Sequence, residues 1–196
     1  YQLKMLSTSS FKPLAASMGP MLKEESLHLV TGANGLRRIV KQGVIPISLL
    51  QKYINKWLST GLDLFGTDDS TSAQWAYVYG VKGRYDERES DIEADRAHLN
   101  EASRGLYFEE LRKEMVRISK SRKDGEPELF LPSDKFNRGI GKYAGEKFTV
   151  YGEAFEGTDS EYEAYLETVI PTDEDEDRLI NDYMKKEWIQ YREWKG

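Results

Sequence analysis

The chain of 196 residues contains no cysteine and only two histidines, and both facts limit its chemistry. Without cysteine there are no disulfides, no thiolate metal ligands and no cysteine nucleophiles. No apolar run approaches the roughly 20 residues that cross a membrane, and no signal-peptide pattern is present, so we expect no membrane partner and a cytoplasmic location. The net charge of −6 argues against a nucleic-acid partner.

The rest of the composition is that of a globular chain with the length of one ordinary domain. Hydrophobic residues make up 39% of it and aromatic residues 12%, which is enough for a real core. Helical periodicity dominates and predicts a mainly α fold. We expect a helical bundle over residues 1–120, then an irregular lobe with a possible hairpin and two closing helices over residues 121–196. The sequence starts at Tyr1 in mid-pattern, so we interpret it as a piece of a longer or processed chain.

Residues 11–32 predict a helix with a mixed face. Steps of three and four place these residues on one side: Leu14, Met18, Met21, Leu22, Glu25, His28, Leu29 and Gly32. That side is apolar except for Glu25 and His28, which need a partner if the stripe is buried, because an unpaired buried charge is costly. Two interpretations remain open. The pair is either one Glu-x-x-His half of a di-iron carboxylate site or a Glu–His hydrogen bond inside a core.

Proline and glycine set the expected limits of this helix. Pro20 removes a backbone donor and should kink the helix just before the Glu-x-x-His pair. Gly32 is a natural helix stop. Residues 29–36 also look like a dinucleotide-binding turn, but Arg38 occupies the position of the third glycine and no acidic residue follows at the expected distance. A helix end and a turn are therefore preferred.

Residues 47–66 form the clearest amphipathic helix, which starts after Pro46. Its expected solvent-facing side is polar: Gln51, Lys52, Asn55, Lys56, Ser59 and Asp63. The aromatic neighbourhoods of Trp57 and Trp75 are candidates for a pocket wall, with ordinary core packing as the alternative.

The second half of the chain offers weaker site candidates. Lys82 and Arg84 flank a glycine and are candidates for a phosphate contact, with solvated surface as the alternative. His98 follows an aspartate by three residues, but its charged neighbours predict an exposed face without a metal role. Gly105 is expected to divide residues 86–120 into two helices.

The last third of the chain changes character, because glycine and proline interrupt residues 121–157. We expect short strands over residues 128–131 and 147–151 and closing helices over residues 160–170 and 173–191. Pro171 separates the two helices, and Thr172 with Asp175 predicts a capping box at the start of the second.

Six stretches resemble those of a known family and occur in the family's order along the chain. They are Tyr1-Gln2-Leu3, residues 22–28 with Gly32, Asp63-Leu64-Phe65-Gly66, Lys82-Gly83-Arg84-Tyr85, residues 136–141, and residues 166–177. Together they resemble the oxygenase subunit of benzoyl-CoA 2,3-epoxidase, a relative of the phenylacetyl-CoA epoxidase catalytic subunit. The ordered set is more specific for the wider acyl-CoA epoxidase group than for benzoyl-CoA.

The resemblance implies a ferritin-like helical bundle with a di-iron centre. It implies that Glu25 and His28 form the last Glu-x-x-His of the metal set and that Lys82 and Arg84 contact the phosphates of CoA. The family's other metal ligands lie upstream of the stretch that matches Tyr1 and are not in this sequence. We therefore expect a missing N-terminal segment or a partner chain to complete the di-iron site.

The resemblance also implies a reaction and its partners. We expect the C-terminal portion of an O2-dependent monooxygenase that epoxidises an aromatic ring carried as a CoA thioester. Electrons would come from a separate flavin and iron–sulfur reductase. The alternative is a non-catalytic or truncated ferritin-like helical protein that binds a partner or an acyl-CoA.

Overall fold

The computed structural model describes residues 1–83 and 99–183, and this part is mainly helical, as the periodicity predicted. The elements are α1 (Gln2–Leu6), α2 (Lys12–Gln42), α3 (Ile47–Asp63), α4 (Thr71–Val78), α5 (Leu99–Ser119), α6 (Asp159–Val169), α7 (Asp173–Arg178) and the π-helical turn η2 (Leu179–Tyr183). Among these residues the β pairing consists of one isolated antiparallel bridge, between Phe148 and Ala154.

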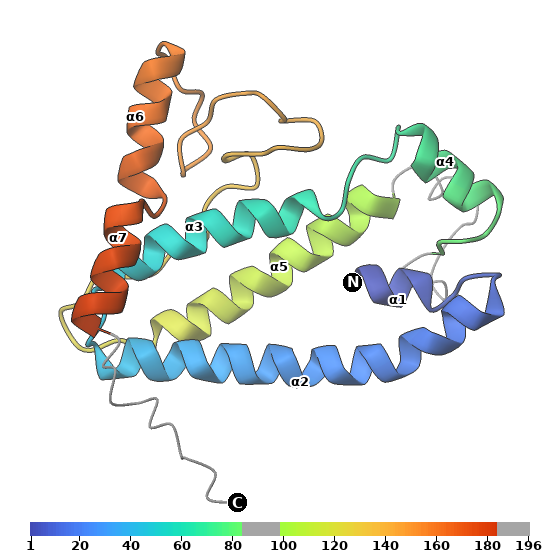
Figure 1. Cartoon of the computed structure of the whole chain (residues 1–196), viewed down its shortest axis with the longest axis horizontal. Coiled ribbons are helices and arrows are strands. Elements are labelled where there is room, and N and C mark those ends of the chain that lie inside the picture. Colours follow the sequence, from blue (N-terminus) through green and yellow to red (C-terminus); the bar gives the residue numbers. More distant parts are fainter. Residues whose placement is uncertain (84–98, 184–196) are drawn as a thin grey trace, which may run out of the picture.

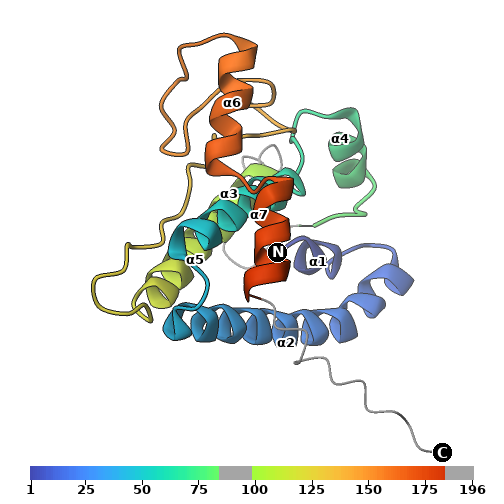
Figure 2. The ribbon, with the colours of Figure 1, turned by 60° about the vertical axis from the view of Figure 1, so that its left-hand side comes forward.

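The helices form an open layer arrangement around three long members (Figure 1). α2 lies along one side, while α3 and α5 run next to each other across from it. α1 and α4 lie at one end of the molecule, and α6 and α7 lie at the other, where α6 rises away from α2 (Figure 2). None of the helices in the described ranges has both the length and the apolar character needed to cross a membrane.

α2 is longer than the sequence predicted. It contains 31 residues and continues through Gly32 to end before Gly43, whose φ of 59° is the left-handed conformation that glycine adopts readily. The prediction that Gly32 stops the helix is wrong. The packing of Leu36 and Val40 into the core stabilises the extra turns, while one interior glycine costs only about 1 kcal/mol. This continuous helix also confirms that residues 29–36 are not a nucleotide-binding turn.

Pro20 lies inside α2, and Figure 1 shows the helix bent in the N-terminal third that holds it. This agrees with the kink predicted from the missing backbone donor of proline. The bend turns the first residues of α2 toward α1, which packs against it. The helix beyond the bend can then run straight to the core.

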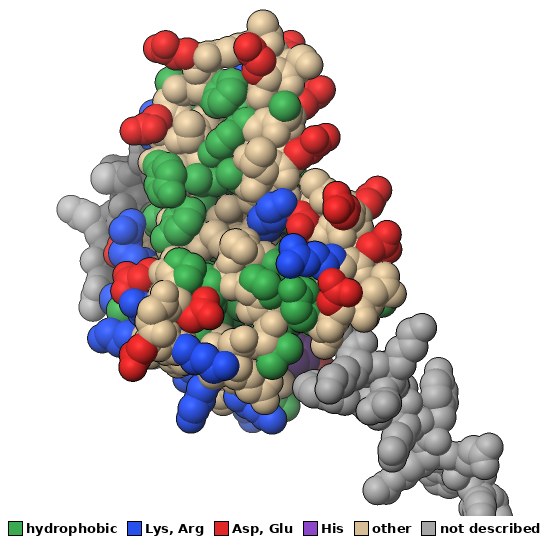
Figure 3. Space-filling model, turned by 90° about the vertical axis from the view of Figure 1, so that its left-hand side faces the viewer, with side chains coloured by type: hydrophobic (Ala, Val, Ile, Leu, Met, Phe, Trp, Pro, Cys, Tyr) green, Lys and Arg blue, Asp and Glu red, His purple; other side chains and the backbone are tan. Residues whose placement is uncertain are grey.

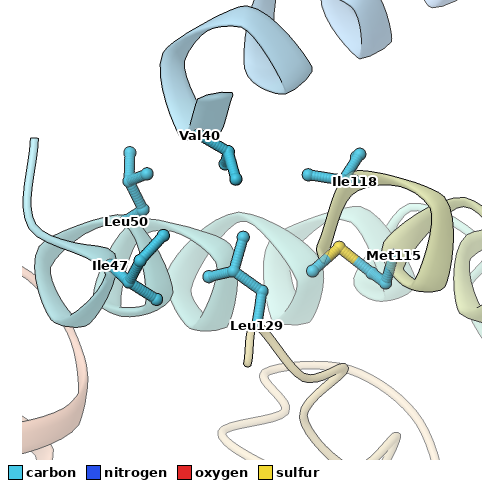
Figure 4. Close-up of a cluster of buried hydrophobic side chains, with 6 residues drawn as sticks. All are labelled: Val40, Ile47, Leu50, Met115, Ile118 and Leu129. Atoms are coloured by element: carbon cyan, nitrogen blue, oxygen red, sulfur yellow. The ribbon is translucent and has the colours of Figure 1, made fainter. Parts of the chain in front are cut away.

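The main hydrophobic core lies where the C-terminal half of α2 meets α3 and α5 (Figure 4). Its buried members are Val40, Ile47, Leu50, Met115, Ile118 and Leu129. Leu129 comes from the irregular segment after α5 and points into the space between the helices. The core therefore joins both parts of the chain that the sequence suggested, and a division at residue 120 stays a prediction.

Three residues of the predicted polar side of α3, Gln51, Asn55 and Ser59, are buried, contrary to the sequence prediction. Gln51 and Asn55 are 9% and 2% exposed. The Gln51 side chain donates to the Phe130 carbonyl and accepts from the Phe130 amide, each at 2.9 Å. The Asn55 amide donates to the Val169 carbonyl at 2.8 Å. These amides replace the strand pairing predicted for residues 128–131, so that strand prediction is wrong.

Two further predictions about local structure are corrected. α5 is continuous through Gly105, which therefore does not divide it. Residues 147–155 form a hairpin-like turn, in which Thr149 donates to the Glu153 carbonyl at 2.8 Å, rather than a strand. The irregular lobe with one hairpin is otherwise as predicted.

The closing helices agree with the sequence as far as the described residues extend. Thr172 and Asp175 form the predicted capping box of α7, and Thr158 with Glu161 forms a second one at α6 that the sequence analysis missed. Figure 3 shows acidic side chains along one edge of the face over α6 and α7, beside a band of hydrophobic side chains. Negative charge in these first turns is favourable with the helix dipole. No metal is therefore needed to explain it.

Replacing Gln51 with alanine should lower the free energy of unfolding by about 1–3 kcal/mol, because the Phe130 amide and carbonyl lose their partners in a buried place. Urea unfolding of both proteins measures the difference. Gln74 on α4 is exposed, so Gln74→Ala is the matched control and should stay within about 0.5 kcal/mol of wild type. Equal stabilities for Gln51→Ala and the control would contradict this assignment.

The ion pair between Lys52 and Asp175 predicts a pH-dependent stability. Its Nζ–Oδ2 distance is 2.6 Å, and the hydrogen bond from Lys52 lowers the pKa of Asp175 below its ordinary 3.8. A lowered pKa stabilises the fold fully above pH 3.8, and this contribution is lost as the pH falls below that value. Lys52→Met should therefore lower the free energy of unfolding by up to about 1 kcal/mol at neutral pH. In acid, the variant and the wild type should become equally stable.

Urea unfolding from neutral pH to below pH 3.8 measures the difference in free energy of unfolding between Lys52→Met and the wild type. Lys56→Met, on an exposed position of the same helix, is the control and should show no such dependence. A gap for Lys52→Met that stays constant below pH 3.8 would contradict the role of Asp175.

Candidate functional site

Glu25 and His28 lie on the same side of α2, one turn apart, as the Glu-x-x-His spacing predicted. The Glu25 Oε1 atom is 3.5 Å from the His28 Nδ1 atom, and both side chains are 59% exposed. Glu24 lies on the other side of the imidazole, with its Oε1 atom 4.0 Å from His28 Nε2. Glu24 was not among the predicted site residues, although its four-residue spacing from His28 on a helix was the available signal.

The stripe that carries this pair is exposed, and the expectation that it is buried is wrong for this structure. Every residue from 23 to 32 is exposed, including Leu27, Leu29 and Val30, which are 64%, 61% and 56% exposed. α1 covers the N-terminal part of α2, and the core covers only its C-terminal part. The middle of α2 thus carries three large exposed apolar side chains without a cover among the described residues, and exposed apolar patches often mark an interaction site.

The donor atoms of this pair suit a metal ion such as iron, which accepts both carboxylate oxygen and imidazole nitrogen. Their 3.5 Å separation lets both turn toward one ion without moving the backbone. Two donors do not complete a metal site. Residues 1–83 and 99–183 contain no group of three or more histidine, aspartate or glutamate residues placed to hold a metal. The pair by itself therefore supplies two donor groups, and a metal centre here would need further ligands.

The other candidates within the described residues, Lys82, Trp57 and Trp75, make their contacts away from this pair. Lys82 is half-buried, its ammonium donates to the Asn100 side chain, and burial lowers its pKa. Arg84 and His98 lie outside the described residues, so the CoA-phosphate and surface roles predicted for them stay predictions. Trp57 and Trp75 are 63% and 54% exposed and are neither core nor the wall of an enclosed pocket.

Lys82 belongs to a polar network at the start of α5. Asp68 accepts hydrogen bonds from the backbone amides of Asn100 and Glu101, at 2.7 and 2.9 Å. Asn100 in turn accepts from the Lys82 ammonium, and burial together with the Asp68 carboxylate raises the pKa of Tyr77. The network fixes the beginning of α5 against the loop before α4. Lys82 therefore has a structural partner already.

Two of the family motifs meet at the C-terminal end of α3. The Arg138 side chain, 2% exposed, donates from Nε to Asp63 Oδ1 at 2.7 Å. The backbone amides of Gly139 and Ile140 donate to the same carboxylate at 2.8 and 3.2 Å. A Cβ atom on Gly139 would lie 3.0 Å from Asp63 Oδ2, which explains the glycine. The contact fastens the irregular lobe to the helices and is structural.

An open pocket of about 300 Å³ lies beside this junction, in the irregular lobe. Lys147 and Asp159 line it and form an ion pair with a 2.6 Å Nζ–Oδ1 distance. Its lining comes from residues 137–147 and from α6, so no residue of α2 contributes. The pocket is therefore separate from the Glu25–His28 pair.

Comparison with known proteins supports the family resemblance over part of the chain. No family model matches. Benzoyl-CoA oxygenase component B of Aromatoleum evansii is 35% identical over an alignment of 106 residues, which takes in 44% of this chain and 22% of that protein. The chain is thus a partial relative of a benzoyl-CoA oxygenase component, and it spans well under half of that relative's length.

Arg138→Lys should lower the free energy of unfolding by about 1.5–3 kcal/mol, although it keeps the charge. The guanidinium also donates to the carbonyls of Asp134 and Ile140, at 3.0 and 3.1 Å, and an ammonium cannot reach all three partners. Urea unfolding measures the loss, with exposed Arg112→Lys as the control. An Arg138→Lys variant as stable as the control would contradict the structural role of this contact.

Proposed function

We propose that this chain is the C-terminal portion of the oxygenase component of an O2-dependent di-iron monooxygenase that epoxidises an aromatic acyl-CoA such as benzoyl-CoA. One observation carries the proposal: a Glu-x-x-His pair with its donors 3.5 Å apart, on a helix surface that no described residue covers. The partial likeness to a protein named benzoyl-CoA oxygenase component B supports the substrate class. A ferritin-like bundle in the cytoplasm is part of this proposal.

In this proposal Glu25 would hold iron through its carboxylate, and His28 would hold iron through a ring nitrogen. When bound, the di-iron centre supplies the activation of O2 for transfer of one oxygen atom to the ring. α2 places the two donors on one side of the helix, because the residues are one helical turn apart. Met21 and Leu29 on the same stripe would exclude water once the stripe is covered.

The remaining ligands belong, in this proposal, to helices that cover the exposed stripe of α2. These helices come from an upstream segment of the same protein or from a partner chain. A separate flavin and iron–sulfur reductase supplies the electrons, which agrees with a relative named as one component of an oxygenase. Lys82 and Arg84 remain proposed contacts for the CoA phosphates.

As a monomer, the 196-residue chain should bind iron weakly and should not epoxidise benzoyl-CoA. Two protein donors are too few to enclose two irons, and both are exposed to water. Metal analysis after gel filtration, together with an assay for the epoxide, tests this. Two tightly held irons per monomeric chain would contradict it.

In the complete protein, His28→Ala should abolish O2-dependent turnover and leave the fold intact, because the side chain is exposed and its loss creates no cavity in the described part. Glu25→Gln should reduce turnover comparably, since it removes the charge that balances the metal while keeping the shape. Both effects are measured with reductase-coupled assays, and circular dichroism checks the fold.

His98→Ala is the matched control for these variants, because His98 is the chain's other histidine. It should leave turnover nearly unchanged. Loss of turnover in His98→Ala with normal turnover in His28→Ala would show that the metal pair is misassigned. Normal turnover in all variants would show that the reaction does not need Glu25 or His28, whereas a complete wild-type protein without turnover would favour the non-catalytic helical protein.

A further inference from the structure

Lysine and arginine gather where α2 and α5 end next to each other. Residues 37–44 and 112–128 hold nine of these cations and four acidic residues, a net charge of +5 on a chain whose total charge is −6. Both helices contribute to the buried core cluster at this end (Figure 4). The Lys123 side chain, just after α5, lies against the end of α2, 3.0 Å from where a Cβ atom on Gly43 would be. The positive charge of the chain is therefore concentrated at this end.

Six of these cations are exposed and form what we call the basic end surface: Arg38, Lys41, Lys113, Arg117, Lys120 and Lys123. The three on α5 follow one another in steps of four and three, so they share one side of that helix. Arg117 is linked to α2 through Glu114, which also binds Arg37. Figure 3 shows Lys and Arg side chains toward the lower end of this side of the molecule and mostly acidic ones at its upper end.

Internal contacts account for only part of this charge. The helix dipole stabilises cations in the last turn of a helix, which explains Lys41 in α2 and Arg117 in α5. Among the residues that the structure describes, Arg117 is also the only member of the basic end surface that forms an ion pair. Like charges without counterions repel one another and lower the stability of a fold. The stability of this chain therefore does not explain the other four cations.

We infer that the basic end surface docks an acidic face of a partner protein. Under the function proposed above, on which this inference rests, the partner is the separate reductase that supplies the electrons. Charge complementarity mainly speeds and orients an encounter, and electron-transfer partners meet through small, weak interfaces. Arg38 lies ten residues beyond His28 on α2, about 15 Å along the helix. The partner would therefore contact the helix that carries the Glu25–His28 pair without needing to cover that pair.

Exposed aliphatic side chains favour a protein over a nucleic acid as the occupant. Val44 and Val116, 60% and 51% exposed, lie in the same two ranges as the cations. Protein interfaces combine apolar contacts with a polar rim, whereas the phosphate backbone is bound through positive charge and hydrogen bonds. The rest of the chain carries a net charge of −11, which repels a long polyanion more than a compact acidic face that contacts only this end.

The first experiment measures the binding of the purified flavin and iron–sulfur reductase to the complete protein by biolayer interferometry. Affinity should fall at least tenfold between about 10 mM and about 100 mM salt, because the Debye length shrinks from about 30 Å to about 10 Å. At the lower salt concentration the double variant Lys113→Glu and Lys120→Glu should bind at least tenfold more weakly than wild type. Both side chains are exposed, and circular dichroism checks that the helices are intact.

The matched control is the double variant Lys12→Glu and Lys56→Glu, which makes the same change of charge at exposed positions outside the basic end surface. It should bind the reductase within about twofold of wild type. Wild-type binding that does not respond to salt, no binding at all, or equal weakening in both double variants overturns the inference. A 20-base-pair DNA duplex that displaces the reductase at about 150 mM salt overturns the assignment to a protein partner.

Steady-state turnover of the complete protein at varied reductase concentration separates this inference from the proposed function. The Lys113→Glu and Lys120→Glu variant should raise the KM for the reductase at least tenfold and keep kcat within about twofold, because the reacting groups are unchanged once the partner is docked. Turnover with an unchanged KM overturns the docking surface and leaves the proposed function standing. A wild type without turnover, whose reductase binding still depends on salt and on Lys113 and Lys120, contradicts the proposed reaction and supports the docking surface.

Discussion

The fold depends on the burial of hydrogen-bonding groups along α3. Gln51 and Asn55 bind backbone groups at Phe130 and Val169, and Asp63 binds Arg138 and two backbone amides at the end of the same helix. A segment without regular strands has no ladder to satisfy its own amides and carbonyls, so it needs side-chain partners when it is covered. α3 supplies these partners at three levels, and the irregular lobe and closing helices are held to it.

This arrangement covers both ends of α2 and leaves its middle exposed. Its last turns enter the core through Leu36 and Val40, its first turns meet α1, and the stretch between them is exposed on all sides. A helix whose exposed residues include Leu27, Leu29 and Val30 gains stability when something covers it. The Glu25–His28 pair lies on this stretch, so covering the helix and completing the metal site are proposed to be one event.

Local signals in the sequence predicted the elements well and their surroundings poorly. Pro46 marked the start of α3, and Thr172 with Asp175 marked the start of α7, because caps and prolines act over a few residues. Gly32 and Gly105 were expected to end helices and do not, since the packing of distant residues outweighs the cost of one glycine. The spacing of Glu25 and His28 predicted their common direction. Their exposure, the burial of Gln51 and the structural partner of Lys82 depend on contacts between remote segments, which a periodic pattern does not encode.

The central claim is that His28, together with Glu25, binds a metal. The chain has two histidines, so ring-proton NMR resolves both, and a paramagnetic ion broadens only the ring it approaches. Titration of the chain with cobalt(II) is the most direct measurement, because weak binding suffices for broadening. The account predicts that the His28 ring signals broaden at cobalt concentrations that leave those of His98 sharp. Broadening of His98 with an unaffected His28 would contradict it.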